Sequence, residues 1–218
     1  MKPTNLNLYI VDDDDALRRS LVSLLNSHLR DFSLRDFESG EAFLEGADLD
    51  SNGVVVMDLR MKPGMSGLEV FNILQERKSQ LAIVFLSGHG TIPDAVRAME
   101  GGAVSWLIKP CPNEELVQVV QRAKERAVQI AIRRRARQHA LALWAKLSRR
   151  EKQMALPCAQ GKSSKLISQE FTAASDPVEY RTVDNHRARI MSKLEVPNTN
   201  ALLAFLTEHG LTDEPQSK

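Results

Sequence analysis

The sequence predicts an α/β domain built on a doubly wound, five-stranded parallel sheet, followed by a long helical linker and a smaller all-helical domain. Two observations carry this prediction. Short apolar segments alternate with amphipathic stretches through the first 125 residues, and beyond Trp144 only helical patterns remain. The length of 218 residues also favours two domains. We place them at residues 1–125 and 144–218, with residues 126–143 as the linker.

Five segments of the first domain have the composition of strands, and two of them are continuously apolar, as is typical of buried strands. The predicted strands are Leu6–Val11, Ser33–Phe37, Val54–Met57, Ala82–Leu86 and Ser105–Ile108. The helices between and after them are Ala16–Leu29, Gly40–Leu44, Gly67–Glu76, Ile92–Glu100 and a long one from Asn113. This alternation favours a parallel sheet of order 2-1-3-4-5, with functional groups at the carboxyl ends of its strands.

The helix from Asn113 has Glu114 and Glu115 in its first turn, where the helix dipole favours anions. Its apolar spacing continues towards Arg137 through a basic segment that we interpret as the linker. The sequence leaves open whether the linker is one continuous helix.

Beyond Trp144 we expect short helices and no strands. Ser148 and Glu151 have the spacing of a capping box, which opens a helix ending at Gly161. Ser163 or Ser164 caps the next helix, Lys165–Phe171. Asp176, Pro177 and Glu179 suit the start of a third, which runs to Leu194, and the fourth spans Thr199–His209. A turn between the middle two helices is helix-turn-helix architecture.

The net charge of +1 conceals an asymmetry between the two halves. Residues 1–125 contain 13 Lys and Arg against 19 Asp and Glu, and residues 126–218 contain 16 against 9. An acidic first half suits a cation site, and a basic second half suits a polyanionic partner, although such charges are also common on solvated faces.

Several features indicate a cytoplasmic protein with no membrane partner. No apolar stretch approaches 18 residues, and the N-terminal segment is too polar for a secretory signal. Cys111 and Cys158 lie far apart without metal-ligand spacing, as expected of reduced thiols. The five histidines show no ligand spacing either.

Polar groups follow four of the predicted strands and should converge at one edge of the sheet. They are Asp12 and Asp13, Asp58, Ser87, and Lys109. Clustered carboxylates suit Mg²⁺, and a carboxylate there can attack phosphorus as a nucleophile. A transferring phosphoryl group also needs a cation and a hydroxyl donor, which Lys109 and Ser87 supply.

These residues resemble the signature of receiver domains, closest to the FixJ branch of response regulators. The matching motifs are Val11-Asp12-Asp13, Asp58-Leu59-Arg60-Met61, Ser87-Gly88-His89-Gly90 and Lys109-Pro110, within residues 6–125. The resemblance implies that a sensor histidine kinase phosphorylates Asp58. It also implies that Asp13, Asp58 and the backbone carbonyl of Arg60 bind Mg²⁺, with Asp12 assisting through water.

The same resemblance implies roles for the neighbouring residues. Ser87 and Lys109 would stabilise the phosphoryl group, and the Lys109–Pro110 bond would be cis. Trp106 occupies the position of a switching aromatic residue, where Tyr or Phe is usual, although ordinary packing is an equally good interpretation. The segment Met61–Gly67 contains one residue more than the family pattern, so the loop before the third helix is expected to differ.

The second domain resembles the LuxR-type helix-turn-helix. The resemblance rests on Leu147–Glu151, Gly161-Lys162, Arg181–Arg187 and Ile190–Leu194, within residues 145–210. It implies that Asp184, Asn185 and Ala188 face base edges, since Asn pairs with adenine, Asp accepts from cytosine and Ala contacts a thymine methyl. Arg181, Arg187, Arg189 and Lys193 of the same helix are positioned to meet phosphates, and Lys162, Lys165 and Thr182 are further candidate DNA-binding residues.

The turn of this motif departs from the family pattern. Six residues, Thr172–Pro177, stand where one is usual. Either the turn bulges outward, or the recognition helix starts about one turn early, at Pro177. In the second case Asp176 and Glu179 would bring negative charge near the DNA phosphates.

The resemblance implies a phosphorylation-switched transcription regulator that dimerises on activation and binds double-stranded promoter DNA, with RNA polymerase as a further partner. Enzymatic activity would be limited to self-phosphorylation and self-dephosphorylation of Asp58. Two alternatives remain open: a protein-interaction or phosphorelay module with weak or no DNA binding, and a metal-dependent phosphohydrolase. The kinase, the stimulus, the operator and the sign of regulation do not follow from the sequence.

Overall fold

The computed structural model describes residues 6–30, 32–88 and 90–212, which divide into two compact units, residues 1–132 and 133–218. His89 of the Ser87–Gly90 motif lies outside the described residues, as do Met1–Asn5 of the N-terminal segment. The long helix α5, Asn113–Ala145, spans the boundary between the units without a break.

The first unit contains a five-stranded parallel sheet in the order β2-β1-β3-β4-β5, which confirms the predicted fold class and topology. The strands are β1 Leu6–Val11, β2 Phe32–Phe37, β3 Gly53–Met57, β4 Ala82–Ser87 and β5 Ser105–Ile108. The helices between them are α1 Asp15–His28, α2 Gly40–Gly46, α3 Gly67–Glu76 and α4 Ile92–Glu100.

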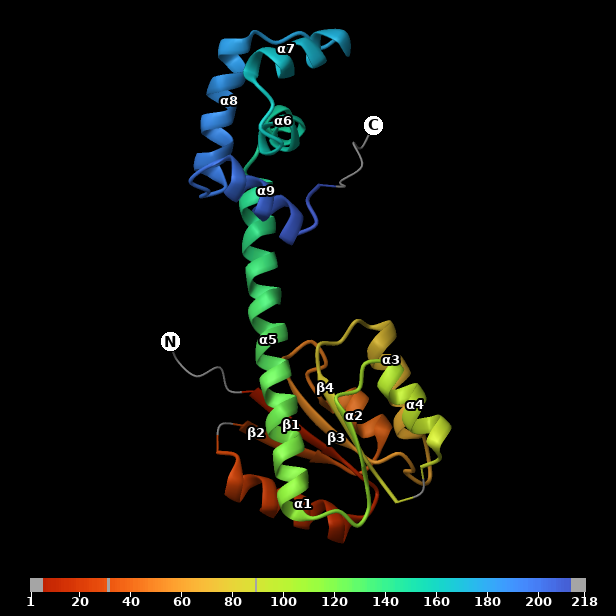
Figure 1. Cartoon of the computed structure of the whole chain (residues 1–218). Helices are drawn as coiled ribbons and strands as arrows, with labels where there is room; N and C mark the ends of the chain where they lie inside the picture. Colours follow the sequence, from red (N-terminus) through yellow and green to blue (C-terminus); the bar gives the residue numbers. More distant parts are fainter. Residues whose placement is uncertain (1–5, 31, 89, 213–218) are drawn as a thin grey trace. The chain divides into compact units, whose positions relative to one another are not determined.

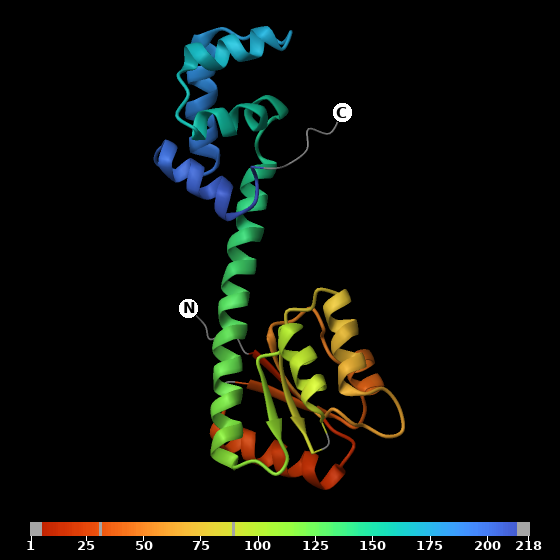
Figure 2. The ribbon, with the colours of Figure 1, turned by 45° about the vertical axis from the view of Figure 1, so that its right-hand side comes forward.

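Both faces of this sheet are covered by helices (Figures 1 and 2). Alternate residues of the central strands point to opposite faces, so Ile10 and Val56 pack with α1 and α5, whereas Val55 and Phe85 pack with α2, α3 and α4. Burial on both faces explains why β3 and β4 are continuously apolar. The polar residues that follow these strands are therefore left at the rim of the sheet.

The second unit contains α6 Arg149–Ala159, α7 Ser164–Ala173, α8 Tyr180–Lys193 and α9 Thr199–Glu208. The predicted capping box is present at the start of α6, where Ser148 and Glu151 exchange hydrogen bonds, and Ser163 caps α7. One core cluster joins the helices, with Met154 of α6, Ile167 of α7, Val183 of α8 and Leu202 of α9 all buried. Figure 1 shows these helices in cyan to blue.

Of the two alternatives for the enlarged turn, the early start of the recognition helix at Pro177 is wrong. Helix α8 begins at Tyr180, with Glu179 as its N-cap, rather than at Pro177 with an Asp176 cap. The cap residue Glu179 makes no side-chain hydrogen bond to the helix. The reason is tertiary: Asp176 forms an ion pair with Arg150 of α6, so its carboxylate is not available as a cap.

Candidate metal centre and nucleic-acid interface

Three carboxylates gather at the carboxyl ends of β1 and β3. Asp12 and Asp13 follow β1, Asp58 follows β3, and one oxygen from each lies within 4.8 Å of the others. Asp12 is 2% exposed and Asp58 is 9% exposed, whereas Asp13 is open to solvent. Parallel strand order brings these residues together, since the ends of neighbouring strands meet at one edge. The cluster offers only oxygen ligands.

Lys109, directly after β5, lies against two of these carboxylates. Its Nζ is 2.6 Å from Oδ2 of Asp12 and 3.0 Å from Oδ2 of Asp58. Burial alone would lower the pKa of Lys109, but the hydrogen bonds and charges of Asp12 and Asp58 outweigh it and raise that pKa. The pKa of the Asp12 carboxyl is raised, because the effect of burial is larger than the opposite effect of the hydrogen bond from Lys109. Lys109 therefore supplies a fixed positive charge beside Asp58.

Ser87 and Trp106 lie on the two neighbouring strands. Ser87 ends β4 with 1% of its surface exposed, and its carbonyl accepts a hydrogen bond of 2.9 Å from the backbone N–H of Lys109. Trp106 of β5 is half-buried, with its ring centroid 5.3 Å from that of Phe85. The Lys109–Pro110 bond is cis, as expected.

The loop that carries the extra residue is held at two points. The backbone N–H of Lys62 donates to Oδ2 of Asp13 at 3.1 Å, and that of Met65 donates to Oε1 of Glu41 at 2.7 Å. The Lys62–Pro63 bond is also cis, a feature that was not predicted from the sequence. The contact between Lys62 and Asp13 ties the loop after β3 to the loop after β1. Arg60, in the loop after β3, is exposed.

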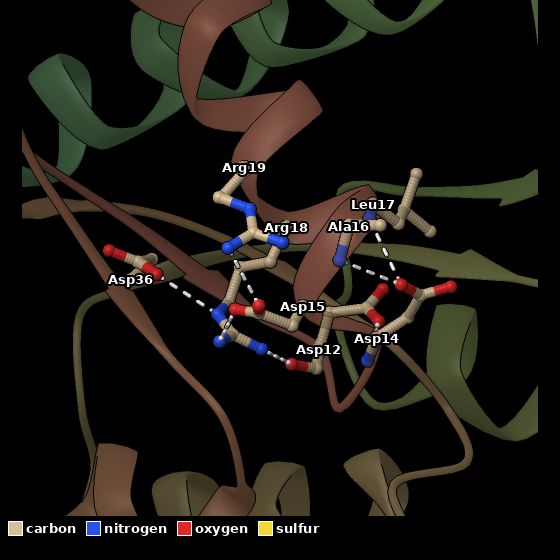
Figure 3. A network of polar contacts seen from close by, with 8 residues as sticks. All are labelled: Asp12, Asp14, Asp15, Ala16, Leu17, Arg18, Arg19 and Asp36. Atoms are coloured by element: carbon tan, nitrogen blue, oxygen red, sulfur yellow. Dashed lines mark hydrogen bonds and ion pairs between the residues drawn. The ribbon is translucent and has the colours of Figure 1, made fainter.

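A buried arginine also contacts the loop after β1, and sequence reasoning gave it no role (Figure 3). Arg18, in the first turns of α1, donates through Nη1 to the backbone carbonyl of Asp12 at 2.8 Å. It also pairs with Asp15 and Asp36. An arginine on an amphipathic helix usually marks a solvated face. The only sequence signal was its position three residues after a run of aspartates.

In the second unit, six of the predicted DNA-binding residues of α8 are solvent-exposed. They are Arg181, Thr182, Asp184, Asn185, Ala188 and Arg189. Lys165, at the start of α7, is exposed as well. This face combines cationic side chains with an amide, the groups that bind phosphates and base edges.

Several of the predicted DNA-binding residues also make contacts within the unit. Arg187 donates through Nη2 to the carbonyl of Lys162 at 2.5 Å, and Lys162 forms an ion pair with Glu170 at 2.6 Å. Asp184 accepts a hydrogen bond from Ser164. These contacts link α7 to α8 and give the residues a structural role.

Lys193 also pairs inside the unit, with a residue of α6. Its Nζ lies 2.7 Å from Oε2 of Glu151, which is 2% exposed. The same carboxylate closes the capping box of α6. This pair therefore links the end of α8 to the start of α6.

The enlarged turn folds back onto α6. Arg150 pairs with the carboxylate of Asp176 and donates to its backbone carbonyl at 2.9 Å, while its guanidinium stacks on the ring of Phe171 at 4.4 Å from the centroid. Ser168 of α7 donates to the carbonyl of Val178 at 2.6 Å. The negative charge of Asp176 is thus paired with a positive charge of the same unit, at its surface.

Among the described residues, no helix is both long and apolar enough to cross a membrane.

Comparison with known proteins assigns both units to families. Residues 8–121 match the response regulator receiver domain, and residues 145–206 match the bacterial regulatory proteins of the LuxR family. The chain is 33% identical over 211 residues to the transcriptional regulatory protein FixJ of Bradyrhizobium diazoefficiens, covering 97% of this chain and 99% of FixJ. It is 36% identical over 199 residues to the transcriptional regulatory protein TdiR of Thauera aromatica, covering 91% of this chain and 84% of TdiR.

Among solved structures, the response regulator StyR superposes with a TM-score of 0.79 at 31% identity, covering 94% of this chain and all of StyR. The similarity to FixJ and StyR extends over nearly the whole length of both chains in each comparison. The chain belongs to the response regulators that join a receiver domain to a LuxR-family regulatory domain.

Proposed function

We propose that this protein is a transcription regulator switched by phosphorylation of Asp58, with a sensor histidine kinase as the phosphoryl source. The observation that carries the proposal is the position of Asp58, 3.0 Å from Nζ of Lys109 and within the carboxylate cluster. A carboxylate oxygen of Asp58 attacks phosphorus and the bond to the donor breaks, which leaves an acyl phosphate on Asp58. Lys109 neutralises the phosphoryl oxygens, and the Ser87 hydroxyl donates to them.

Mg²⁺ is the cofactor that the cluster fits. Its ligands would be Asp13, Asp58 and the backbone carbonyl of Arg60, with Asp12 assisting through water. The fit rests on the oxygen-only donor set and the spacing of the carboxylates, since Mg²⁺ prefers oxygen ligands and keeps several waters. When bound, the metal supplies positive charge to the phosphoryl group.

Phosphorylation is proposed to act through Ser87 and Trp106, which are neighbours of the site on β4 and β5. Movement of Ser87 towards the phosphoryl group makes room for Trp106 to turn inward, and this changes the surface of α4 and β5. The protein then dimerises. Two recognition helices of a dimer read a two-fold site on DNA about one helical turn apart.

DNA binding is assigned to α8 and the start of α7. The exposed cations Lys165, Arg181 and Arg189 would bind phosphates, and Asn185 and Ala188 would face bases. Lys162, Arg187 and Lys193 would add positive charge from positions fixed by their internal contacts. RNA polymerase is a further partner at the promoter, and the cytoplasm is the compartment in which these partners meet. Catalysis is confined to the phosphorylation and dephosphorylation of Asp58 itself.

The test measures duplex DNA affinity and oligomeric state of the full chain with and without acetyl phosphate plus Mg²⁺, in the wild type and in Asp58→Ala. We expect the donor to raise both DNA affinity and dimer content in the wild type only. Equal DNA binding by both proteins under all conditions would exclude phosphate control. Absence of DNA binding at low salt would favour the protein-interaction module instead.

A further inference from the structure

Arg18 is a buried cation whose three donor groups reach three different acceptors (Figure 3). Its side chain is 10% exposed. Nη1 donates to the carbonyl of Asp12 at 2.8 Å, Nε to Oδ2 of Asp36 at 2.9 Å, and Nη2 to Oδ1 of Asp15 at 2.7 Å. A lysine has one nitrogen and lacks this planar fork, so it cannot reproduce the set.

The bond from Arg18 completes the fixation of Asp12. Oδ1 of Asp12 accepts from the backbone N–H of Asp14 at 2.9 Å, and Oδ2 accepts from Lys109 at 2.6 Å. The carbonyl bonded to Arg18 belongs to the peptide that links Asp12 to Asp13. Holding this peptide therefore sets the direction in which the exposed Asp13 side chain leaves the backbone. Asp14 in turn caps α1 through Ala16 and Leu17, which anchors the far end of the loop.

The charge of Arg18 is offset by its own partners. Asp15 and Asp36 supply two carboxylates at hydrogen-bond distance, and both are partly exposed on the side of α1 and β2. The guanidinium can therefore hold the loop without placing an uncompensated positive charge behind a cation site. Of the three hydrogen bonds that Arg18 makes with Asp12, Asp15 and Asp36, the one to the Asp12 carbonyl reaches the metal centre.

We propose that Arg18 is a positioning residue for the metal centre, which fixes the Asp12–Asp13 peptide so that both carboxylates face the cation. The inference rests on the proposed Mg²⁺ site. Groups that hydrogen-bond the metal ligands without binding the metal themselves usually contribute about 10- to 100-fold to metal affinity. Loss of the guanidinium is expected to act in this range, because the Asp12 carbonyl would lose its buried donor and the peptide would be free to rotate.

The experiment is calorimetric titration of the unphosphorylated full chain with Mg²⁺, which needs no turnover. Arg18→Met is expected to weaken Mg²⁺ binding by about 10-fold or more. Arg18→Lys is expected to restore little of it. Arg19→Met is the matched control, since Arg19 is the next residue, its side chain is 72% exposed, and it forms a surface ion pair with Asp15. Its effect should stay below about twofold.

A second control separates positioning from stability. Leu25→Ala removes a fully buried side chain from the same helix and destabilises the core without touching the loop. If Leu25→Ala weakens Mg²⁺ binding as much as Arg18→Met does, Arg18 acts through stability alone and the inference fails. Unchanged affinity in Arg18→Met beside a binding wild type also overturns it. A wild type that binds no Mg²⁺ overturns the proposed metal centre itself, and the role of Arg18 with it.

Discussion

The indole of Trp106 lies directly over Gly90, at the start of the segment leading into α4. A Cβ atom at residue 90 would come within 2.1 Å of Cζ2 of Trp106, closer than any real contact. The lack of space beside the indole therefore favours a glycine at this position. The larger aromatic residue at the proposed switch position is thus accommodated by the absence of a side chain opposite it.

Gly90→Ala is therefore expected to displace Trp106 towards solvent and to lower the free energy of unfolding by about 1–3 kcal/mol, as overpacking does. Acrylamide quenching of Trp106 fluorescence, in a Trp144→Phe background, measures the displacement. Gly88→Ala is the control, because the nearest atom to its Cβ is 3.8 Å away. Equal quenching in the two variants would contradict the packing role of Gly90.

Glu151→Gln is expected to destabilise the second unit by about 1–3 kcal/mol, since Lys193 and the cap of α6 lose a charged acceptor. Burial alone would raise the pKa of Glu151, but hydrogen bonds from Lys193 and Ser148 outweigh it and lower the pKa. A carboxyl with a lowered pKa contributes stability above its ordinary pKa of 4.5, and this contribution is lost as the pH falls through the folded-state value. The free energy of unfolding of the wild type, measured with urea, should fall over this acidic range. That of Glu151→Gln should fall less over the same range. If the stability of the wild type and that of Glu151→Gln fall equally with pH, the ionised pair of Glu151 and Lys193 is not the cause of the pH dependence.

Arg187→Ala and Arg189→Ala should separate structure from DNA contact on the same helix. Arg187 binds the carbonyl of Lys162, so its loss should lower the free energy of unfolding by about 1–3 kcal/mol. Arg189 is exposed, so its loss should change the free energy of unfolding by no more than about 0.5 kcal/mol. It should reduce the slope of log DNA affinity against log salt concentration by about one. Thermal unfolding and salt titrations of DNA affinity check both expectations. Equal destabilisation by the two variants would contradict the assignment.

Arg150→Ala should weaken DNA binding more than Arg149→Ala does, although both remove one positive charge. Arg150 neutralises Asp176, and its removal leaves an unpaired carboxylate in the turn before α8. Adding Asp176→Asn to Arg150→Ala should then recover part of the affinity. Fluorescence anisotropy with labelled duplex measures all three variants. A double variant no better than Arg150→Ala would show that the charge of Asp176 is irrelevant to binding.

The strands and helices of the first unit were predictable because each one carries its own periodic pattern. Continuous apolar runs in β3 and β4 indicated a sheet buried on both faces, and the parallel order placed Asp12, Asp58 and Lys109 at one rim. The capping box at Ser148 was equally local, since both partners lie within one helical turn. Each of these strand and helix patterns is set by a few neighbouring residues, and the alternation of strands with helices then implies the parallel order that brings the rim residues together.

Contacts between residues distant in sequence were decided only by the tertiary structure. Arg18 meets Asp36 across 18 residues, Lys62 meets Asp13 across 49, and Arg150 meets Asp176 across 26. Asp176, the expected cap, pairs with Arg150 instead, and α8 begins at Tyr180. A side chain on a helix has the same local pattern whether it faces water or a distant partner. The sequence by itself therefore determined the family, the sheet and the acidic rim, and packing decided which charges hold that rim in place.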